Sequence, residues 1–271
     1  MATTYTDSET AIIAALGVGA ALCVLRIKAD DIDFDLARGA DKGEPCADEA
    51  QNTTAPSGGI GQGLKELLEC FRDLLQQKAV LVFLVSAVIF HFANAAMVPL
   101  VTQLLAGGVG PKRAVLFTSG YMLASQLVFM VVAAASGKLA GKLGRKPLFL
   151  FGFAALAARG VLYTLSHHPA ALIAVQCMDG LGAGIFGVVG VLIIADLTKG
   201  TGRFNAAQGA IATAQGIGAF LSNSVAGYLA KSRGYDFTFL VLAGIAAVGL
   251  GFFWWLMPET RQAADDVPAA A

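Results

Sequence analysis

Two ionisable side chains stand inside long apolar stretches of this sequence. Arg159 lies nine residues before His168, and Asp179 lies eleven residues after it. A helix rises 1.5 Å per residue, so in two antiparallel helices these charges fall within roughly 3 Å of the same depth. A lone charge costs about 2.5–3.5 kcal/mol at the centre of a membrane-spanning helix. We therefore predict an ion pair, either as a static structural pair or with Asp179 exchanging protons while the pair opens.

Uncharged polar side chains form a second candidate set. His91 and Asn94 are three residues apart, on one face of a helix, and Gln126 and Gln215 stand near the middle of their own apolar stretches. In lipid each needs a partner or a wet cavity. They either line a cavity, with His91 as a possible proton carrier, or hydrogen-bond between helices. The same alternatives apply to a stripe with members seven residues apart: Gln208, Gln215 and Ser222.

Other kinds of chemistry find no support in the sequence. No Ser/His/Asp set and no metal constellation is recognisable, and the four cysteines are scattered without metal or disulfide spacing. The formal net charge is zero, which gives no indication of nucleic-acid binding. We therefore predict no catalytic residues, no metal, no cofactor and no enzymatic activity.

The elements that must position these residues are long apolar runs. Only 14% of the residues are charged, against about 25% in a soluble domain. A hydrocarbon core about 30 Å thick needs roughly 20 apolar residues per helix. The sequence predicts an all-α membrane protein whose six-helix bundle spans residues 79–257. Its runs are 79–106, 114–136, 148–166, 170–197, 205–230 and 237–257.

The segments outside this bundle differ in character. Residues 1–27 contain a shorter apolar run and are predicted to form a seventh transmembrane helix. Residues 28–78 are predicted to be a cytoplasmic linker that begins with a polar, acidic stretch unable to bury a core. Leucines at helical spacing predict an amphipathic helix over 61–78. Residues 258–271 are predicted to form a cytoplasmic tail.

The distribution of Lys and Arg predicts the orientation. With residue 27 placed in the cytoplasm, fourteen of these residues fall inside, four fall outside and Arg159 lies in the membrane. Cytoplasmic loops carry the excess of positive charge. We expect a multi-pass protein of the plasma (inner) membrane, with its linker and its C-terminus in the cytoplasm.

A basic loop joins the second and third runs of the bundle. It resembles the loop motif G-x-x-x-D-R-x-G-R-K of the major facilitator superfamily (MFS), and the segment Met257-Pro-Glu-Thr-Arg261 is common in that family after the last helix. Four positions of the motif match: Gly137, Gly144, Arg145 and Lys146. Lys142 conservatively replaces the arginine, and Gly141 departs from the motif because it stands at the acidic position.

The resemblance implies that this chain comprises the last helix of an N-terminal half, the central linker and a C-terminal half, with the first five helices missing. Substrate sites in this family lie between the halves, lined by the first, second, fourth and fifth helices of each. Asp196, at the end of the fourth helix, matches the acidic partner of the loop in a gate. The candidate pathway residues lie on the third helix (Arg159) and on the lining helices (His91, Asn94, Gln126, Asp179 and Gln215).

Two functions are consistent with this resemblance. One is a secondary active, proton-coupled solute transporter, with efflux as one direction, whose partners are the lipid bilayer, a small-molecule substrate and protons. The other is a non-transporting half-protein that acts as a scaffold. In either case the polar residues predict association with the missing half or with a second copy.

Overall fold

The computed structural model describes residue 72 and residues 74–261. The predicted helix 1–27 and nearly all of the predicted linker with its amphipathic helix lie outside the described residues. The described part of the chain is mostly helical and contains no strand, which confirms the prediction of an all-α bundle. Its helices are α4 (Lys78–Asn94), α5 (Met97–Val109), α6 (Pro111–Leu143), α7 (Arg145–Leu162), α8 (Pro169–Leu197), α9 (Phe204–Arg233) and α10 (Tyr235–Leu256).

Each of the six predicted runs corresponds to one crossing of the bundle, and the first crossing is broken. Among the described helices, four crossings are long and apolar enough to span a membrane: Lys78–Val109, Lys112–Leu143, Pro169–Leu197 and Tyr235–Leu256. The other two are α7, which carries Arg145, Lys146 and Arg159 within its 18 residues, and α9, which is rich in small and polar residues.

The break in the first crossing separates α4 from α5 at residues 95–96. Pro99 lies four residues after Ala95, near the start of α5. A proline inside a helix has no N–H to donate, and its ring clashes with the carbonyl of the residue four positions earlier. Pro99 therefore accounts for the interruption of the helix at this point. The prediction of one continuous run over 79–106 did not include this break.

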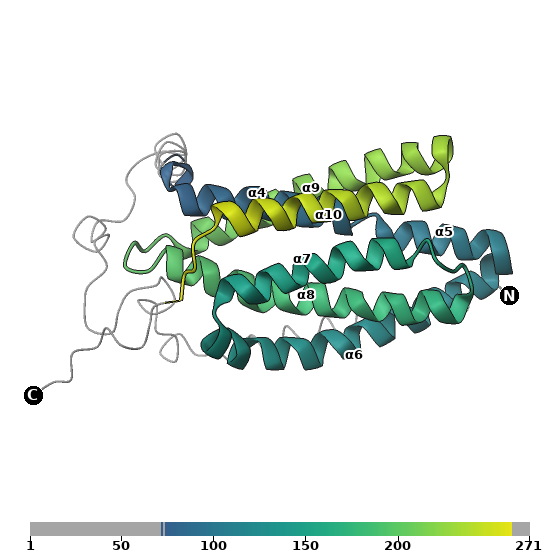
Figure 1. Cartoon of the computed structure of the whole chain (residues 1–271), viewed down its shortest axis with the longest axis horizontal. Helices are drawn as coiled ribbons and strands as arrows, with labels where there is room; N and C mark the ends of the chain where they lie inside the picture. The colour runs from purple at the N-terminus through teal and green to yellow at the C-terminus, as the bar shows by residue number, and fades with distance from the viewer. Residues whose placement is uncertain (1–71, 73, 262–271) are drawn as a thin grey trace, which may run out of the picture.

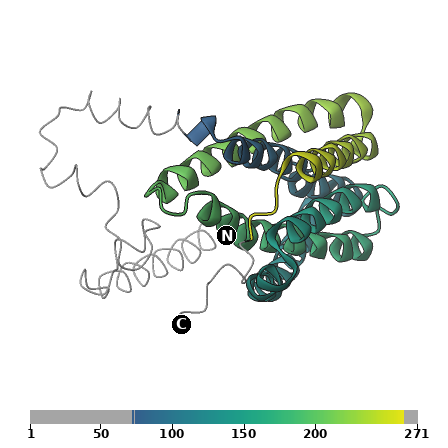
Figure 2. The same ribbon diagram turned by 60° about the vertical axis from the view of Figure 1, so that its left-hand side comes forward.

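The helices lie side by side along the long axis of the molecule (Figure 1), in two groups. In one group α6 packs on α8, and in the other α4 packs on α9 and α10; α7 contacts both α8 and α10 and joins the groups. Figure 2 shows the same bundle obliquely from the end that lies on the left in Figure 1. Because α5 packs against α6, the broken crossing α4–α5 passes from one group to the other.

Two glycines allow close contact between helices. A Cβ at Gly180 would lie 2.3 Å from the backbone oxygen of Ser125, and one at Gly218 would lie 2.4 Å from the backbone oxygen of Val88. No side chain fits at these distances, so α8 meets α6, and α9 meets α4, backbone to backbone. At Gly216, by contrast, a Cβ would meet nothing within 4 Å.

Candidate functional site

The polar centre of the bundle is Arg159 on α7, whose side chain is 1% exposed. Its Nη1 forms an ion pair with Oδ1 of Asp179 on α8, as predicted from their common depth. Its Nη2 donates to Oδ1 of Asn94, the last residue of α4. Three helices therefore contribute to one guanidinium.

Two further side chains complete this cluster, and sequence reasoning missed both. The Met97 sulfur lies 3.3 Å from Nε and 3.1 Å from Nη2 of Arg159, and the Ser125 hydroxyl donates to Oδ2 of Asp179 over 3.4 Å. Neither residue stands out in an apolar run, because serine and methionine are common packing residues in membrane helices. Pro99 was the available signal for Met97, since it marks the break that directs this side chain.

The break between α4 and α5 is held from another helix. The backbone N–H of Ala96 donates to the Ser222 hydroxyl on α9 over 3.0 Å, and the Ser222 side chain is fully buried. A backbone N–H released by a helix break in lipid must find such a partner. For Ser222 the sequence left open whether it lines a cavity or forms a hydrogen bond between helices. The structure shows the hydrogen bond. It positions Asn94 and Met97 on either side of the break.

The two members of the ion pair differ in their access to the exterior. Asp179 is 21% exposed, whereas Arg159 is 1% exposed. One carboxylate oxygen of Asp179 accepts from the guanidinium, and the other accepts only the long hydrogen bond from Ser125. Oδ2 is therefore the more loosely held of the two oxygens and makes no contact with Arg159.

The other predicted pathway residues lie outside this cluster. His91 is half-buried, with Nδ1 3.1 Å from the Ala87 carbonyl oxygen and its ring edge-on to Phe186. Gln126 is exposed on α6, next to the cluster residue Ser125. Gln215 lines a narrow cavity of about 50 Å³ between α8 and α9 together with Gln208. The structure thus brings together Asn94, Arg159 and Asp179, and separates His91, Gln126 and Gln215 from them.

A second polar cluster forms around the basic loop. Nε of Arg145 lies 2.9 Å from Oδ2 of Asp196, and the Thr260 hydroxyl donates to the same oxygen over 3.2 Å. The predicted approach of the loop to the end of α8 therefore occurs. Lys142 takes part through its backbone oxygen, which accepts from Arg261 over 2.7 Å, while Gly137 is exposed within α6.

The residue that organises this cluster, Glu259, was not among the predicted site residues. Its carboxylate accepts from the backbone N–H groups of Arg145 (2.8 Å) and Lys146 (3.1 Å) at the N-terminus of α7. Helix N-termini favour negative charge because their N–H groups lack helical partners. A Cβ at Gly144 would lie 2.5 Å from Oε2 of Glu259, and Gly144 has a φ of 98°, so only glycine suits this turn.

The charge state of Glu259 follows from these contacts. Its partial burial would by itself raise the pKa of the carboxyl group. Hydrogen bonds from backbone N–H groups, those of Arg145 and Lys146 among them, outweigh burial and hold the pKa below its usual value. Position 141 offers no carboxylate because it is a glycine, but Glu259 supplies one to the same loop. The segment 257–261, noted in the sequence only for its resemblance, was the signal for it.

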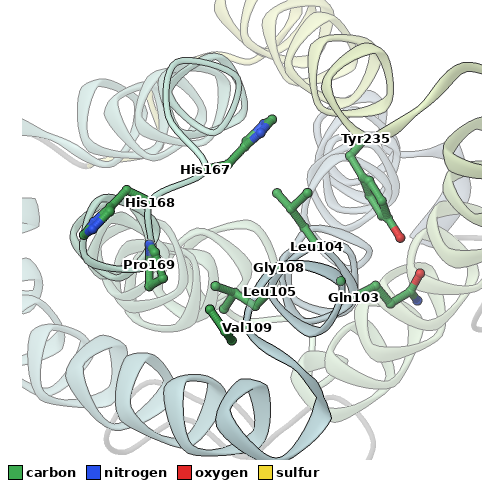
Figure 3. A pocket seen from close by; sticks show the side chains of 10 residues that line it. Gln103, Leu104, Leu105, Gly108, Val109, His167, His168, Pro169 and Tyr235 are labelled. Carbon is green, nitrogen blue, oxygen red and sulfur yellow. The ribbon is translucent and has the colours of Figure 1, made fainter.

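A larger cavity lies at the opposite end of the bundle (Figure 3). It has a volume of about 530 Å³ and is lined by the C-terminal end of α5, the α7–α8 turn and the start of α10. In Figure 3 Leu104 lies between His167 and Tyr235. His167 is also within hydrogen-bond distance of Asp236, with 2.8 Å between Nε2 and Oδ1. No member of the Arg159 cluster lines this cavity. No group of three or more potential metal ligands occurs among the described residues.

Comparisons with known proteins agree with this architecture. The family model described as Major Facilitator Superfamily matches residues 83–271. The uncharacterized MFS-type transporter Rv2456c of Mycobacterium tuberculosis is 42% identical over 251 residues, covering 92% of this chain and 55% of that protein. The multidrug transporter protein MdtP of Bacillus subtilis is 23% identical over 170 residues, covering 62% of this chain and 30% of that protein. The chain therefore spans about half the length, or less, of these relatives.

Proposed function

Because this chain belongs to the major facilitator superfamily, we propose that it forms one half of a secondary active transporter that moves a small molecule across the membrane, coupled to protons. The observation that carries this proposal is the Arg159–Asp179 ion pair inside a membrane bundle, with its more exposed member carrying a loosely held oxygen. Intramembrane ionisable groups mark substrate and proton pathways in transporters.

The coupling we propose is an exchange of partners at Asp179. Protonation of its carboxylate removes the negative charge that compensates Arg159. An uncompensated buried charge costs about 3–5 kcal/mol. The protonated state therefore favours a rearrangement that gives the guanidinium another acceptor. This acceptor is either an anionic group of the substrate or the side-chain oxygen of Asn94 in a closer contact. Because α7 and α8 carry the two charges, this rearrangement moves one helix relative to the other.

A second bundle is part of the proposal. Polar side chains on the exposed surfaces of α6 and α9 would face lipid in a lone bundle, where polar groups are costly. They are Gln126, Thr213, Asn223 and Ser224. The described residues offer Gln126 no hydrogen-bond partner. We propose that these surfaces line a wet cavity shared with an N-terminal half or with a second copy of this chain.

The cluster of Arg145, Asp196 and Glu259 is proposed as the cytoplasmic gate. It ties the start of α7 to the end of α8 and to the segment after α10, so the three ends must separate for the cavity to open on this side. The Lys/Arg asymmetry supports a cytoplasmic position for this end, in the plasma (inner) membrane.

Transport is tested in vesicles that enclose a pH-sensitive dye. We expect no substrate-dependent proton flux from this chain alone. With an N-terminal six-helix bundle supplied as a separate chain, we expect proton flux. The Asp179→Asn variant should abolish this flux. The control Asp236→Asn makes the same change outside the cluster and should leave the flux intact. Lipophilic drugs are the first compounds to test, because one relative is named a multidrug transporter. Flux that survives Asp179→Asn would disprove the coupling role.

The second bundle is tested by crosslinking in membranes. Cysteines at Leu123 on α6 and Phe220 on α9 lie on the exposed surfaces that we assign to the shared cavity, 65% and 71% exposed. Cysteines at Phe151 on α7 and Trp254 on α10, with 57% and 67% exposure, are the matched controls. We expect crosslinks between chains at the first two positions only. Monomeric chains that transport would show that one bundle suffices.

A further inference from the structure

A second concave site lies at the end of the bundle that carries the basic loop, apart from the Arg159 cluster. It has a volume of about 450 Å³ and lies between the start of α4, the start of α7 and the end of α10. Lys78 and Lys146 contribute its two charges, and Trp255, Met257 and Pro258 contribute most of its apolar wall.

The two lysines of this site have no ion-pair partner among the described residues. Lys78 is exposed and Lys146 is half-buried, and neither ammonium group takes part in an ion pair with the described residues. No acidic side chain lies in the first turn of α4 or of α7. The positive end of α4 therefore has no acidic side chain in its first turn, and the N–H groups of Arg145 and Lys146 at the start of α7 are held by Glu259. The two ammonium groups are the charges left to bind an anion here.

The rest of the lining is suited to lipid. Trp254 and Trp255 are 67% and 85% exposed at the end of α10. Tryptophans at the ends of spanning helices lie at the level of the headgroups, because the ring is apolar and its N–H is polar. A soluble anion would use the two lysines but leave the apolar wall in water, whereas a phospholipid covers the wall with its glycerol and acyl region.

We propose that this site binds the headgroup of an anionic phospholipid, with its phosphate between Lys78 and Lys146 and its acyl chains along Trp255. Basic pockets between the ends of membrane helices suit such headgroups. The backbone N–H of Lys146 donates to Glu259, which follows Pro258, so the bound lipid lies directly beside the proposed gate. Lipid binding reinforces the closed arrangement of Arg145, Asp196 and Glu259 by holding the start of α7 against the end of α10.

Fluorescence provides a direct test, because the chain contains only two tryptophans, and one of them, Trp255, lines this site while Trp254 precedes it on α10. In the Trp254→Phe variant Trp255 is the sole reporter, and the unchanged chain is measured in parallel. Vesicles of phosphatidylcholine receive brominated phosphatidylglycerol or brominated phosphatidylcholine with the same acyl chains. Quenching gives the relative association constant of the two lipids at Trp255. We expect preference for phosphatidylglycerol, with roughly fivefold contributed by each lysine.

Single variants decide whether the preference belongs to this site. Lys78→Gln and Lys146→Gln should each lower it about fivefold. Lys138→Gln removes the same charge from an exposed position on α6 that does not line the cavity, and should leave the preference unchanged. Equal quenching by the two lipids, or equal effects of all three variants, would overturn the proposal. Displacement of brominated phosphatidylglycerol by inorganic phosphate at constant ionic strength would identify a site for free anions instead.

Discussion

Arg159 is the most deeply buried charge of the described residues, and its ion-pair partner Asp179 is accessible on one side. The pair is therefore unequal. Removing Asp179 leaves a guanidinium that water cannot reach, whereas removing Arg159 leaves a carboxylate with partial access to the exterior. This inequality is the reason that the proposed coupling assigns the change of charge to the carboxylate and not to the guanidinium.

The inequality predicts unequal effects of substitution. Asp179→Ala should destabilise the bundle by about 3–5 kcal/mol, and Arg159→Met by less, because only the first leaves a fully buried charge. The double variant should recover part of the loss. The measurement is the thermal midpoint of the chain in detergent. A double variant as unstable as the sum of the single variants would show that the two residues do not interact in the protein.

Close helix contact at Gly218 predicts a strong effect of one methyl group. Gly218→Ala should lower stability by about 1–3 kcal/mol, because the new Cβ would have to displace the α4 backbone. The control is Gly216→Ala on the same helix, where a Cβ meets nothing within 4 Å. Alanine favours a helix over glycine by about 1 kcal/mol, so the control should be neutral or stabilising. Equal effects on the thermal midpoint would mean that α9 does not contact α4 in this way.

The hydrogen bond that holds the helix break can be removed without changing any charge. Ser222→Ala leaves the buried N–H of Ala96 without its partner, which costs about 1–3 kcal/mol. Ser224 lies on the exposed side of the same helix and donates only to the Phe220 carbonyl, so Ser224→Ala should change stability by less than about 0.5 kcal/mol. Thermal unfolding of the two variants should separate them clearly, and a stable Ser222→Ala variant would argue against this role.

Glu259 predicts a dependence of stability on pH. Its pKa in the folded protein is lowered, so its carboxylate contributes stability that is complete above the unfolded pKa, about 4.3, and is lost as the pH falls through the folded pKa. The thermal midpoints of the unchanged chain and of Glu259→Gln should therefore differ by a constant amount between pH 6 and pH 8, the chosen assay range. The difference should shrink below pH 4. A difference that already vanishes between pH 8 and pH 6 would point to another group.

The ion pair could be predicted from the sequence because a charge in an apolar run is conspicuous and helical rise fixes its depth. The other side chains that contact the pair could not be predicted in this way, because the depth of a residue does not give its direction around the helix axis. Gln126 and Ser125 illustrate this: they are adjacent, but only Ser125 faces Asp179. Much of α6 is apolar on every side, so hydropathy does not distinguish the surface that faces lipid from the one that faces α8.

The proposed gate shows a different limit of sequence reasoning. The loop motif indicated Arg145 and Asp196, but Glu259 is more than a hundred residues from the loop along the chain. Its role depends on where α10 ends relative to the start of α7, and that relation arises from the packing of α7 against α10. The glycine at position 144 is a local sign of the arrangement, since its conformation and its contact with Glu259 both exclude a side chain.

The orientation of the bundle gives the last prediction. Lys142 and His168 are exposed residues at opposite ends, beside the α6–α7 turn and within the α7–α8 turn. In a background without the four native cysteines, Lys142→Cys should react with an impermeant maleimide only from the cytoplasmic side, and His168→Cys only from outside. The reason is the excess of Lys and Arg on loops at the Lys142 end, which resist translocation across the membrane. Intact cells and inverted vesicles give the two measurements. Reaction of both cysteines from one side would contradict the crossing of α7, and reaction with the sides exchanged would move the proposed gate to the outer surface.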